Sequence, residues 1–349
     1  MKKLLSLMLV FSLLLGLTLP ILAADETRVF TDDAGREVTL KKDIQRIVVS
    51  GPLAQIAVFA IAPEKFVGLA TDWSKASTSL VGAEFVELPV VGQIYGGKGT
   101  VNLEELAKLN PDVMIDLGEA KKTIAEDLDG LQQQIGIPCV HIAAKLDSFG
   151  QAYRRLGDLL GKPEEGEKLA AYCESVYKRT MDIMQQAGEN KTKAVYVVGT
   201  EGLGVLAKTS FHAEVVDLLT DNVAVVQEVS SRGTGNPVDM EQLLVWNPDV
   251  LIFENGSAYA NVEKDGTWQA LKAVQEGKYV EVPFGPYNWM GSPPSVQRYL
   301  ALLWLPKVLY PEIAAYDLYE EVNNYFTMFY HKELPRETYE ELTKNAFFK

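Results

Sequence analysis

A pattern of 15 residues that occurs twice is the feature that most constrains the fold of this chain. Residues 101–115 and residues 238–252 share Val, Glu, Leu, Asn, Pro, Asp, Val and Ile at the same places, with an offset of 137 residues throughout. A solenoid would contain more copies at a shorter spacing. Two copies so far apart predict two similar lobes within one chain.

Each copy begins with a residue that caps a helix and ends in a buried strand. Asn102 and Asp239 are good N-caps, and Asn-Pro-Asp stops the helix that follows. A short apolar strand comes next, at residues 113–117 in one copy and 250–253 in the other. Helices that alternate with such strands predict an α/β fold with parallel sheets. Further strands are expected at residues 46–50, 66–71, 139–143, 193–198, 224–226 and 279–282.

A charged segment without glycine or proline after Gly166 separates the two copies. A helix of about 20 residues there would span about 30 Å and join the lobes as a stiff strut. We therefore divide the chain into an N-terminal lobe at residues 25–163, a connecting helix at 164–188 and a C-terminal lobe at 189–349. Residues 331–349 have the pattern of a terminal helix.

The first 24 residues have the pattern of a cleaved secretory signal peptide. Two lysines are followed by an apolar run at residues 4–19 and by small residues before Asp25. This run is too short and wrongly flanked for a membrane span. No cysteine follows it, so we expect no lipid anchor and a freely diffusing protein in the periplasm.

The charge of the remaining chain excludes some classes of partner. Removal of residues 1–24 takes away two lysines and leaves 31 basic residues against 47 acidic ones, a net charge of −16. Such a charge opposes binding to nucleic acid or to anionic membranes.

Cys139 and Cys173 either pair in an oxidising compartment or remain two buried thiols, and the sequence leaves both open.

The motifs of common enzyme and metal sites are absent from the sequence. It contains no Gly-x-Gly-x-x-Gly turn, no phosphate-binding loop, no Gly-x-Ser-x-Gly elbow and no His-Glu-x-x-His. His141, His212 and His331 are far apart, which makes a metal cage built from protein side chains alone improbable. A cleft that binds an already chelated metal needs fewer protein ligands.

The loops that follow parallel strands converge where open α/β sheets bind ligands. Glycine-rich loops at residues 93–99 and 230–236 precede the two copies at equivalent places, and glycine lets the backbone approach a ligand. The aromatic segment at 284–294 either covers a ligand or packs against the core. The candidate ligand-binding residues are Ser50, Pro52, Trp73, Gln93, Tyr95, Gly96, Thr200, His212, Arg232, Asn236, Tyr259, Tyr287 and Trp289.

Glu104 and Glu241 stand at the same helical position in the two copies. A carboxylate at a helix start favours the helix dipole, which explains either residue alone. Two such residues at matching places also suit a docking surface for a partner with two basic patches.

Several of these features together resemble the substrate-binding proteins of ABC importers, and in particular the group that takes up iron–siderophore, haem and cobalamin complexes. They are the strand at residues 46–50, the two glutamate-containing helices that end in Asn-Pro-Asp-Val, the long central helix and the closing Trp-Met-Gly-Ser-Pro-Pro segment. The resemblance covers about residues 28–330 and implies two Rossmann-like lobes bridged by one rigid helix. It also implies that Glu104 and Glu241 dock onto arginines of a membrane permease.

The resemblance implies a monomeric periplasmic receptor, without enzymatic activity or cofactor, that binds an iron chelate or a related metal complex between its lobes. Its partner would be the permease of an ABC importer. Only Arg232, Lys98 and Lys208 supply cations in the expected cleft, which disfavours strongly anionic catecholate complexes. Haem, cobalamin, a nickel or cobalt complex and a molybdate-like oxyanion remain alternative ligands. An exported α/β enzyme or a sensor-type binding module is the alternative from a different class.

Overall fold

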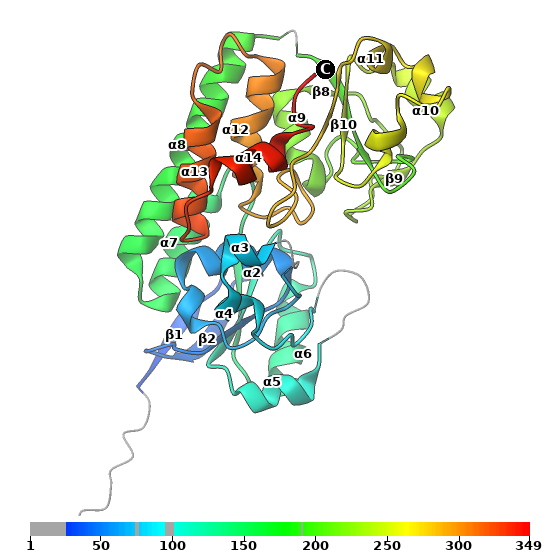
Figure 1. Ribbon diagram of the computed structural model, residues 1–349. Helices are drawn as coiled ribbons and strands as arrows, with labels where there is room; N and C mark the ends of the chain where they lie inside the picture. Colours follow the sequence, from blue (N-terminus) through cyan, green and yellow to red (C-terminus); the bar gives the residue numbers. More distant parts are fainter. Residues whose placement is uncertain (1–25, 74–76, 95–100, 190) are drawn as a thin grey trace, which may run out of the picture.

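The computed structural model describes residues 26–73, 77–94, 101–189 and 191–349. Figure 1 shows two lobes beside one long helix, α8 (Pro163–Ala187), which runs along one side of the molecule. The predicted α/β fold with parallel sheets and a long connecting helix is confirmed. Among the described residues, no helix is both long enough and apolar enough to cross a membrane.

The N-terminal lobe is built on a parallel sheet of three strands in the order β3-β4-β5. These strands are β3 (Ile47–Val49), β4 (Val113–Gly118) and β5 (Cys139–Ala143). An antiparallel hairpin, β1 (Thr27–Thr31) and β2 (Glu37–Lys41), precedes them. The helices of this lobe are α2 (Pro52–Ile61), α3 (Thr78–Val81), α4 (Ala83–Val86), α5 (Leu103–Leu109), α6 (Ile124–Ile135) and α7 (Phe149–Leu160).

The C-terminal lobe contains a mixed sheet in the order β11-β10-β6-β7-β9, with β8 paired to β6. Its strands are β6 (Lys193–Val198), β7 (Gly204–Val205), β8 (Asp221–Asn222), β9 (Asn236–Pro237), β10 (Val250–Phe253) and β11 (Tyr279–Glu281). Its helices are α9 (Glu214–Leu219), α10 (Met240–Trp246), α11 (Lys272–Gln275), α12 (Arg298–Leu309), α13 (Leu318–Phe329) and α14 (Arg336–Thr343). The helix predicted within residues 331–349 is α14.

The two copies of the repeat fold in the same way, as predicted. The side chain of Asn102 accepts hydrogen bonds at the start of α5, and that of Asp239 does so at the start of α10. Both helices end at an asparagine in the left-handed conformation, Asn110 with φ 43° and Asn247 with φ 42°. Asparagine tolerates this conformation better than most residues, which explains why it recurs at both helix ends.

The aspartate of each Asn-Pro-Asp motif ties the end of the helix to a neighbouring strand. Asp112 accepts hydrogen bonds from the backbone N–H groups of Gln45 and Arg46, both at 2.9 Å. Asp249, at the equivalent place, accepts one from the backbone N–H of Lys193 at 3.4 Å. The repeated motif therefore sets where β4 and β10 begin beside the first parallel strand of each lobe.

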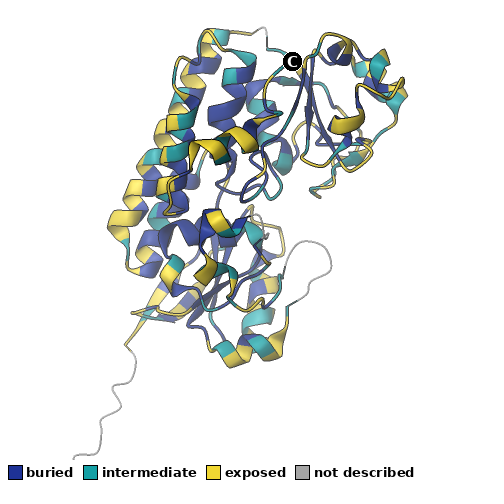
Figure 2. Ribbon diagram, in the orientation of Figure 1, coloured by how far each residue is buried: buried dark blue, intermediate teal, exposed yellow. Residues whose placement is uncertain are grey.

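Alternate residues of the central strands face two different apolar layers. In β4, Val113, Ile115 and Leu117 belong to the largest core cluster, whereas Met114 belongs to the cluster under α6. In β6, residues of the same strand alternate between the largest cluster and a separate one in the C-terminal lobe. Side chains alternate across a strand, so both sheets are covered on both faces, as Figure 2 shows by their buried ribbons.

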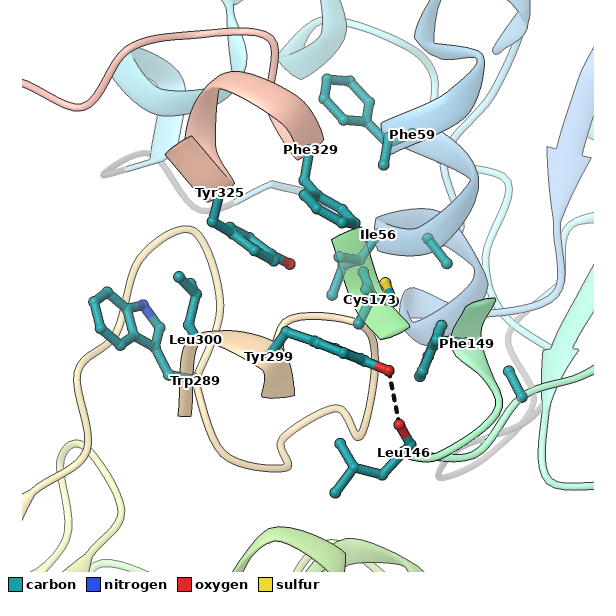
Figure 3. Packing of buried hydrophobic residues seen from close by; sticks show 14 of the residues in the cluster. Ile56, Phe59, Leu146, Phe149, Cys173, Trp289, Tyr299, Leu300, Tyr325 and Phe329 are labelled. Carbon is teal, nitrogen blue, oxygen red and sulfur yellow. Dashed lines mark hydrogen bonds between the residues drawn. The ribbon is translucent and has the colours of Figure 1, made fainter. Parts of the chain in front are cut away.

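The largest core cluster is continuous through both lobes and joins them. It contains residues of α2 in the N-terminal lobe, of the connecting helix α8, and of α12 and α13 near the C-terminus. Figure 3 shows these side chains together, with the Tyr299 hydroxyl donating to the carbonyl of Leu146 at 2.7 Å. Tyr325 and Phe329 of α13 are stacked there, with ring centroids 4.3 Å apart. The chain thus returns from the C-terminal lobe to pack on the N-terminal one.

Two segments that the sequence predicts as strands differ in the structure. Residues 66–71 form only isolated bridges, Phe66 with Ile47 and Leu69 with Val90. Residues 224–226 form no strand, and the nearby pairing to β6 is made by β8 instead. Cys139 and Cys173 are free and buried, and they belong to different core clusters.

The shared core predicts that the two lobes unfold together. Phe329→Ala removes a buried ring at the junction and should lower the free energy of unfolding by about 3–5 kcal/mol. Urea unfolding followed by both tryptophan fluorescence and far-ultraviolet circular dichroism should give one coincident transition, for the parent protein and for the variant. Val245→Ala, at a side chain that is 75% exposed, is the control and should change the free energy by less than about 0.5 kcal/mol. Two separated transitions would contradict a shared core.

Candidate ligand-binding site

A cavity of about 1200 Å³ lies between the two lobes. It is larger than most small-molecule pockets, which measure about 300–1,000 Å³. Both lobes contribute to its wall. The N-terminal lobe contributes residues 50–54, 93, 116–119, 121 and 124, and the C-terminal lobe contributes residues 209–212, 229–234 and 292–294.

The N-terminal wall is formed where parallel strands end. β3 ends at Val49 and the chain turns through Ser50 and Gly51 into α2, whereas β4 reaches the cavity with Asp116 and Leu117. Carboxyl ends of parallel strands lie at one edge of a sheet, which is the usual place for ligands in open α/β sheets. This wall therefore belongs to the rigid part of the lobe.

Three buried polar residues are joined by hydrogen bonds on the N-terminal wall. The Ser50 hydroxyl donates to one carboxylate oxygen of Asp116. The other oxygen of Asp116 lies 2.7 Å from Nδ1 of His141, which is the residue paired with Asp116 in the parallel ladder. Ser50 and Asp116 line the cavity, and His141 lies behind them with no exposed surface.

His212 on the C-terminal wall is held in one orientation. Its Nδ1 lies 2.8 Å from the carbonyl oxygen of Gly291, and a carbonyl can only accept, so Nδ1 is the donor. Its ring packs against Gly233, where an added Cβ would come within 3.2 Å of Cε1. Burial lowers the pKa of His212, although the bond to Gly291 opposes this shift. The imidazole is therefore neutral at neutral pH, with Nε2 as an acceptor.

Arg232 supplies a positive charge to the same wall. It is exposed in the loop between β8 and β9, and its backbone N–H donates to the Ser230 hydroxyl at 3.2 Å. Asn236 shapes this loop, because it accepts from the N–H of Ser230 at 2.9 Å and donates to the carbonyl of Glu228 at 2.7 Å. Among the described residues, no ion pair engages the guanidinium of Arg232.

The structure brings five of the predicted residues together on the cavity wall: Ser50, Pro52, Gln93, His212 and Arg232. Tyr95 and Gly96 lie outside the described residues, as does Lys98. Lys208 forms an ion pair with Asp221 at 3.2 Å and does not line the cavity.

Trp289 and Trp73, which were predicted to line the cavity, are buried in the core instead. Trp289 is fully buried, and its indole N–H donates to the carbonyl of Gly285 at 3.1 Å. Figure 3 places it in the shared core. Trp73 is 3% exposed and packs on Phe59 and Tyr287, with ring centroids 5.2 and 5.4 Å away. The alternative that the sequence left open, burial against the core, describes these residues.

Four other predicted residues also lie away from the cavity wall. Tyr287 is partly buried and packs against the core, where its hydroxyl accepts from the Gln55 amide at 3.1 Å and burial raises its pKa to about 12. Tyr259 packs on Phe253 in the separate cluster of the C-terminal lobe. Thr200 is exposed in the turn that follows β6. Asn236 does not line the cavity either and acts through the loop that it shapes.

Sequence reasoning missed Asp116 and Lys121, and within the segment 284–294 it named none of the residues 292–294 that line the cavity. Asp116 had a readable signal, because it is the one charged residue in the otherwise apolar strand β4. Residues 292–294 are the end of the aromatic segment 284–294, and nothing local distinguishes the residues of this segment that face the cavity from those that face the core.

Glu104 and Glu241 both lie in the first turn of their helices, α5 and α10. The side chain of Glu104 is 85% exposed and lies 3.8 Å from Lys108, and Glu241 is exposed. Figure 1 shows α5 and α10 at the outer ends of the two lobes, away from α8.

Comparison with known proteins gives matches that span both lobes. A family model described as periplasmic binding protein matches residues 69–285. The Fe(3+)-citrate-binding protein YfmC of Bacillus subtilis (strain 168) is 24% identical over 259 residues, which are 72% of this chain and 77% of that protein. An ABC transporter solute binding protein from Sulfurospirillum deleyianum DSM 6946 has a TM-score of 0.80 at 26% identity, and the match covers 91% of this chain and 99% of that one. The periplasmic binding protein MolA of Haemophilus influenzae, bound to molybdate, has a TM-score of 0.70 at 21% identity, covering 88% and 99%.

The lowered pKa of His212 predicts an acid-sensitive stability. Below an unfolded-state pKa of about 6.5, the unfolded chain binds a proton that the folded state does not. The free energy of unfolding therefore decreases as the pH is lowered. His212→Gln should reduce this slope, by at most about 1.4 kcal/mol per pH unit, in urea unfolding of the ligand-free protein between about pH 7.5 and 5.5. Lys208→Gln, in the same loop, should keep the parent slope. An unchanged slope in the His212 variant would show that its imidazole is not held neutral.

Proposed function

The chain belongs to the family of periplasmic binding proteins that serve ABC importers, and we propose that its cargo is a metal chelate, in the first place an iron complex, bound in the interlobe cavity. The protein carries this cargo through the periplasm as a freely diffusing monomer after removal of its signal peptide. It delivers the cargo to an inner-membrane permease without chemical change.

The size and lining of the cavity carry this proposal. About 1200 Å³ is far more than a bare metal ion fills, and it suits a complex that brings its own ligands. The wall offers backbone groups, serine hydroxyls, one neutral imidazole and one guanidinium. Such groups orient an already chelated metal by hydrogen bonds and charge. The similarity to a protein named for Fe(3+)-citrate supports an iron complex as the first candidate.

The buried group formed by Ser50, Asp116 and His141 is not arranged for nucleophilic catalysis. A serine nucleophile needs a histidine base within hydrogen-bonding distance of its hydroxyl. Here the Ser50 hydroxyl donates to Asp116, and the same carboxylate separates it from His141. This order of contacts favours a binding role for the cavity over the alternative of an exported enzyme.

Arg232 is expected to bind an anionic part of the chelate. It is exposed on the C-terminal wall and is not engaged by a described carboxylate, so its five donors are available. A hydrogen bond to a charged group contributes about 1.5–3 kcal/mol.

The glutamates of α5 and α10 are expected to dock onto basic residues of the permease, one from each lobe.

A calorimetric titration with a panel of cargoes tests the proposed function. Ferric citrate, a ferric hydroxamate, haem, cobalamin, a nickel–histidine complex and molybdate are titrated into the purified protein. At least one metal chelate should bind, and Arg232→Gln should weaken its binding by about 1.5–3 kcal/mol. Lys208→Gln, which removes a lysine that pairs with Asp221 outside the cavity, should bind as the parent does. Failure of every chelate to bind would refute the function.

A double charge reversal tests the docking surface. Glu104→Arg combined with Glu241→Arg should abolish cargo-dependent stimulation of the permease ATPase in proteoliposomes, because like charges then face each other. Cargo affinity should stay unchanged, since neither residue lines the cavity. Glu164→Arg combined with Glu337→Arg reverses two exposed charges on α8 and α14 and should leave stimulation intact. Full stimulation by the first variant would contradict docking through these glutamates.

A further inference from the structure

Asp116 is an ionisable residue in a strand, β4, that is otherwise apolar. It lies in β4 between Ile115 and Leu117, which are buried in the core, and it is itself only 6% exposed. The small exposed part of Asp116 lies on the cavity wall. A buried carboxylate is costly unless other groups bond to it, so its presence here requires an explanation.

Two neighbours hold the carboxylate in one orientation. Ser50 donates to Oδ1, and His141 lies 2.7 Å from Oδ2. Backbone contacts fix both neighbours in turn: the N–H of Ser50 donates to the carbonyl of Ile115 at 3.0 Å, and the N–H of His141 donates to Asp32 at 3.2 Å. The carboxylate therefore cannot turn away from whatever enters the cavity.

The hydrogen-bonding pattern indicates which nitrogen of His141 carries the hydrogen. A carboxylate oxygen only accepts, so Nδ1 of His141 carries the hydrogen. Nε2 of His141 is buried and has no partner in the described part of the chain, and a second N–H there would remain unpaired. A hydrogen on Nδ1 and none on Nε2 fits both facts.

From the described residues, each oxygen of Asp116 accepts one hydrogen bond, which leaves it one lone pair for a further donor. On the cavity side, these lone pairs need a donor when the cargo displaces water, because a buried acceptor without a donor is unfavourable. Arg232, on the wall of the other lobe, has the opposite requirement and needs an acceptor. At these two residues the walls therefore offer opposite groups, an acceptor on one wall and donors on the other.

We infer that the cargo is a chelate with two different ends: a hydrogen-bond donor, such as a hydroxyl, an amine or a metal-bound water, against Asp116, and an anionic group against Arg232. This inference rests on the proposed function and narrows its ligand class. Hydroxycarboxylate and aminocarboxylate chelates have both kinds of group. Molybdate at neutral pH has acceptors only, and so do fully deprotonated tris-catecholate complexes, so Asp116 selects against them.

The test compares three probes on the full mature protein by calorimetric titration. Ferric citrate brings carboxylates and metal-bound water, ferrioxamine B brings a terminal ammonium but no anionic end, and molybdate brings no donor. The parent protein should bind ferric citrate more tightly than molybdate, and ferrioxamine B, which satisfies Asp116 alone, should lie between them. Asp116→Asn keeps the shape of the side chain and removes the carboxylate. It should weaken the binding of the preferred chelate by about tenfold or more and leave the affinity for molybdate unchanged.

Two further variants keep the result interpretable. Glu126→Gln removes an exposed carboxylate of α6 that does not line the cavity, and it should change the affinity by less than about threefold. Ser50→Ala leaves the charge of Asp116 in place but removes one of its two anchors, and it should weaken the chelate while the fold, checked by circular dichroism, is retained. Ser50→Ala also tests the role of Asp116 if the Asp116→Asn variant does not fold.

Two outcomes would overturn the inference while leaving the function in place. One is a chelate affinity that neither Asp116→Asn nor Ser50→Ala changes. The other is a parent protein that binds molybdate more tightly than both chelates. A parent protein that binds no metal chelate at all is a different result, because it refutes the function from which the inference starts.

Discussion

The apolar core that runs from one lobe into the other is the constraint on which the rest of the structure depends. Helix α8 lies along both lobes, α12 packs on α8, and α13 returns to pack on α2 of the N-terminal lobe. Because protein interiors are close-packed, the lobes cannot rotate freely about such a junction without breaking contacts. The Tyr299 hydroxyl, bonded to the carbonyl of Leu146, adds a directional link at the same place. The width of the cavity is therefore set by this packing before any ligand arrives.

Within that frame the two walls of the cavity have different origins. The N-terminal wall is carried by strand ends, and Ser50, Asp116 and His141 hold one another in place there. The C-terminal wall is carried by loops, of which one is shaped by Asn236 and another is fixed to His212 through Gly291. The fixed carboxylate of Asp116 on one wall and the exposed guanidinium of Arg232 on the other make the two sides of the cavity chemically different. A symmetric or purely anionic cargo could not interact favourably with both.

Much of the fold could be predicted from the sequence because its signals are local. The caps Asn102 and Asp239 and the asparagines that end α5 and α10 act through their own helices, so the repeat alone located two helices and two strands. The ligand-binding site could be predicted less well from the sequence. Whether Trp289 faces the cavity or the core depends on packing against distant segments, and no local pattern separates the two. Asp116 acquires its role only when the sheet places it beside Ser50 and His141, residues that are remote in sequence.

An interlobe distance measurement tests the central claim, a cavity framed by one rigid core, most directly. Spin labels on cysteines introduced at Lys108 of α5 and Val245 of α10 report the separation of the lobes, and the native Cys139 and Cys173 are buried. Double electron–electron resonance should give the same distance distribution without cargo and with saturating ferric citrate, or with whichever chelate the calorimetric panel identifies. A shift to shorter distances on binding would show that the lobes close over the cargo and would contradict the shared core as the element that sets the cavity.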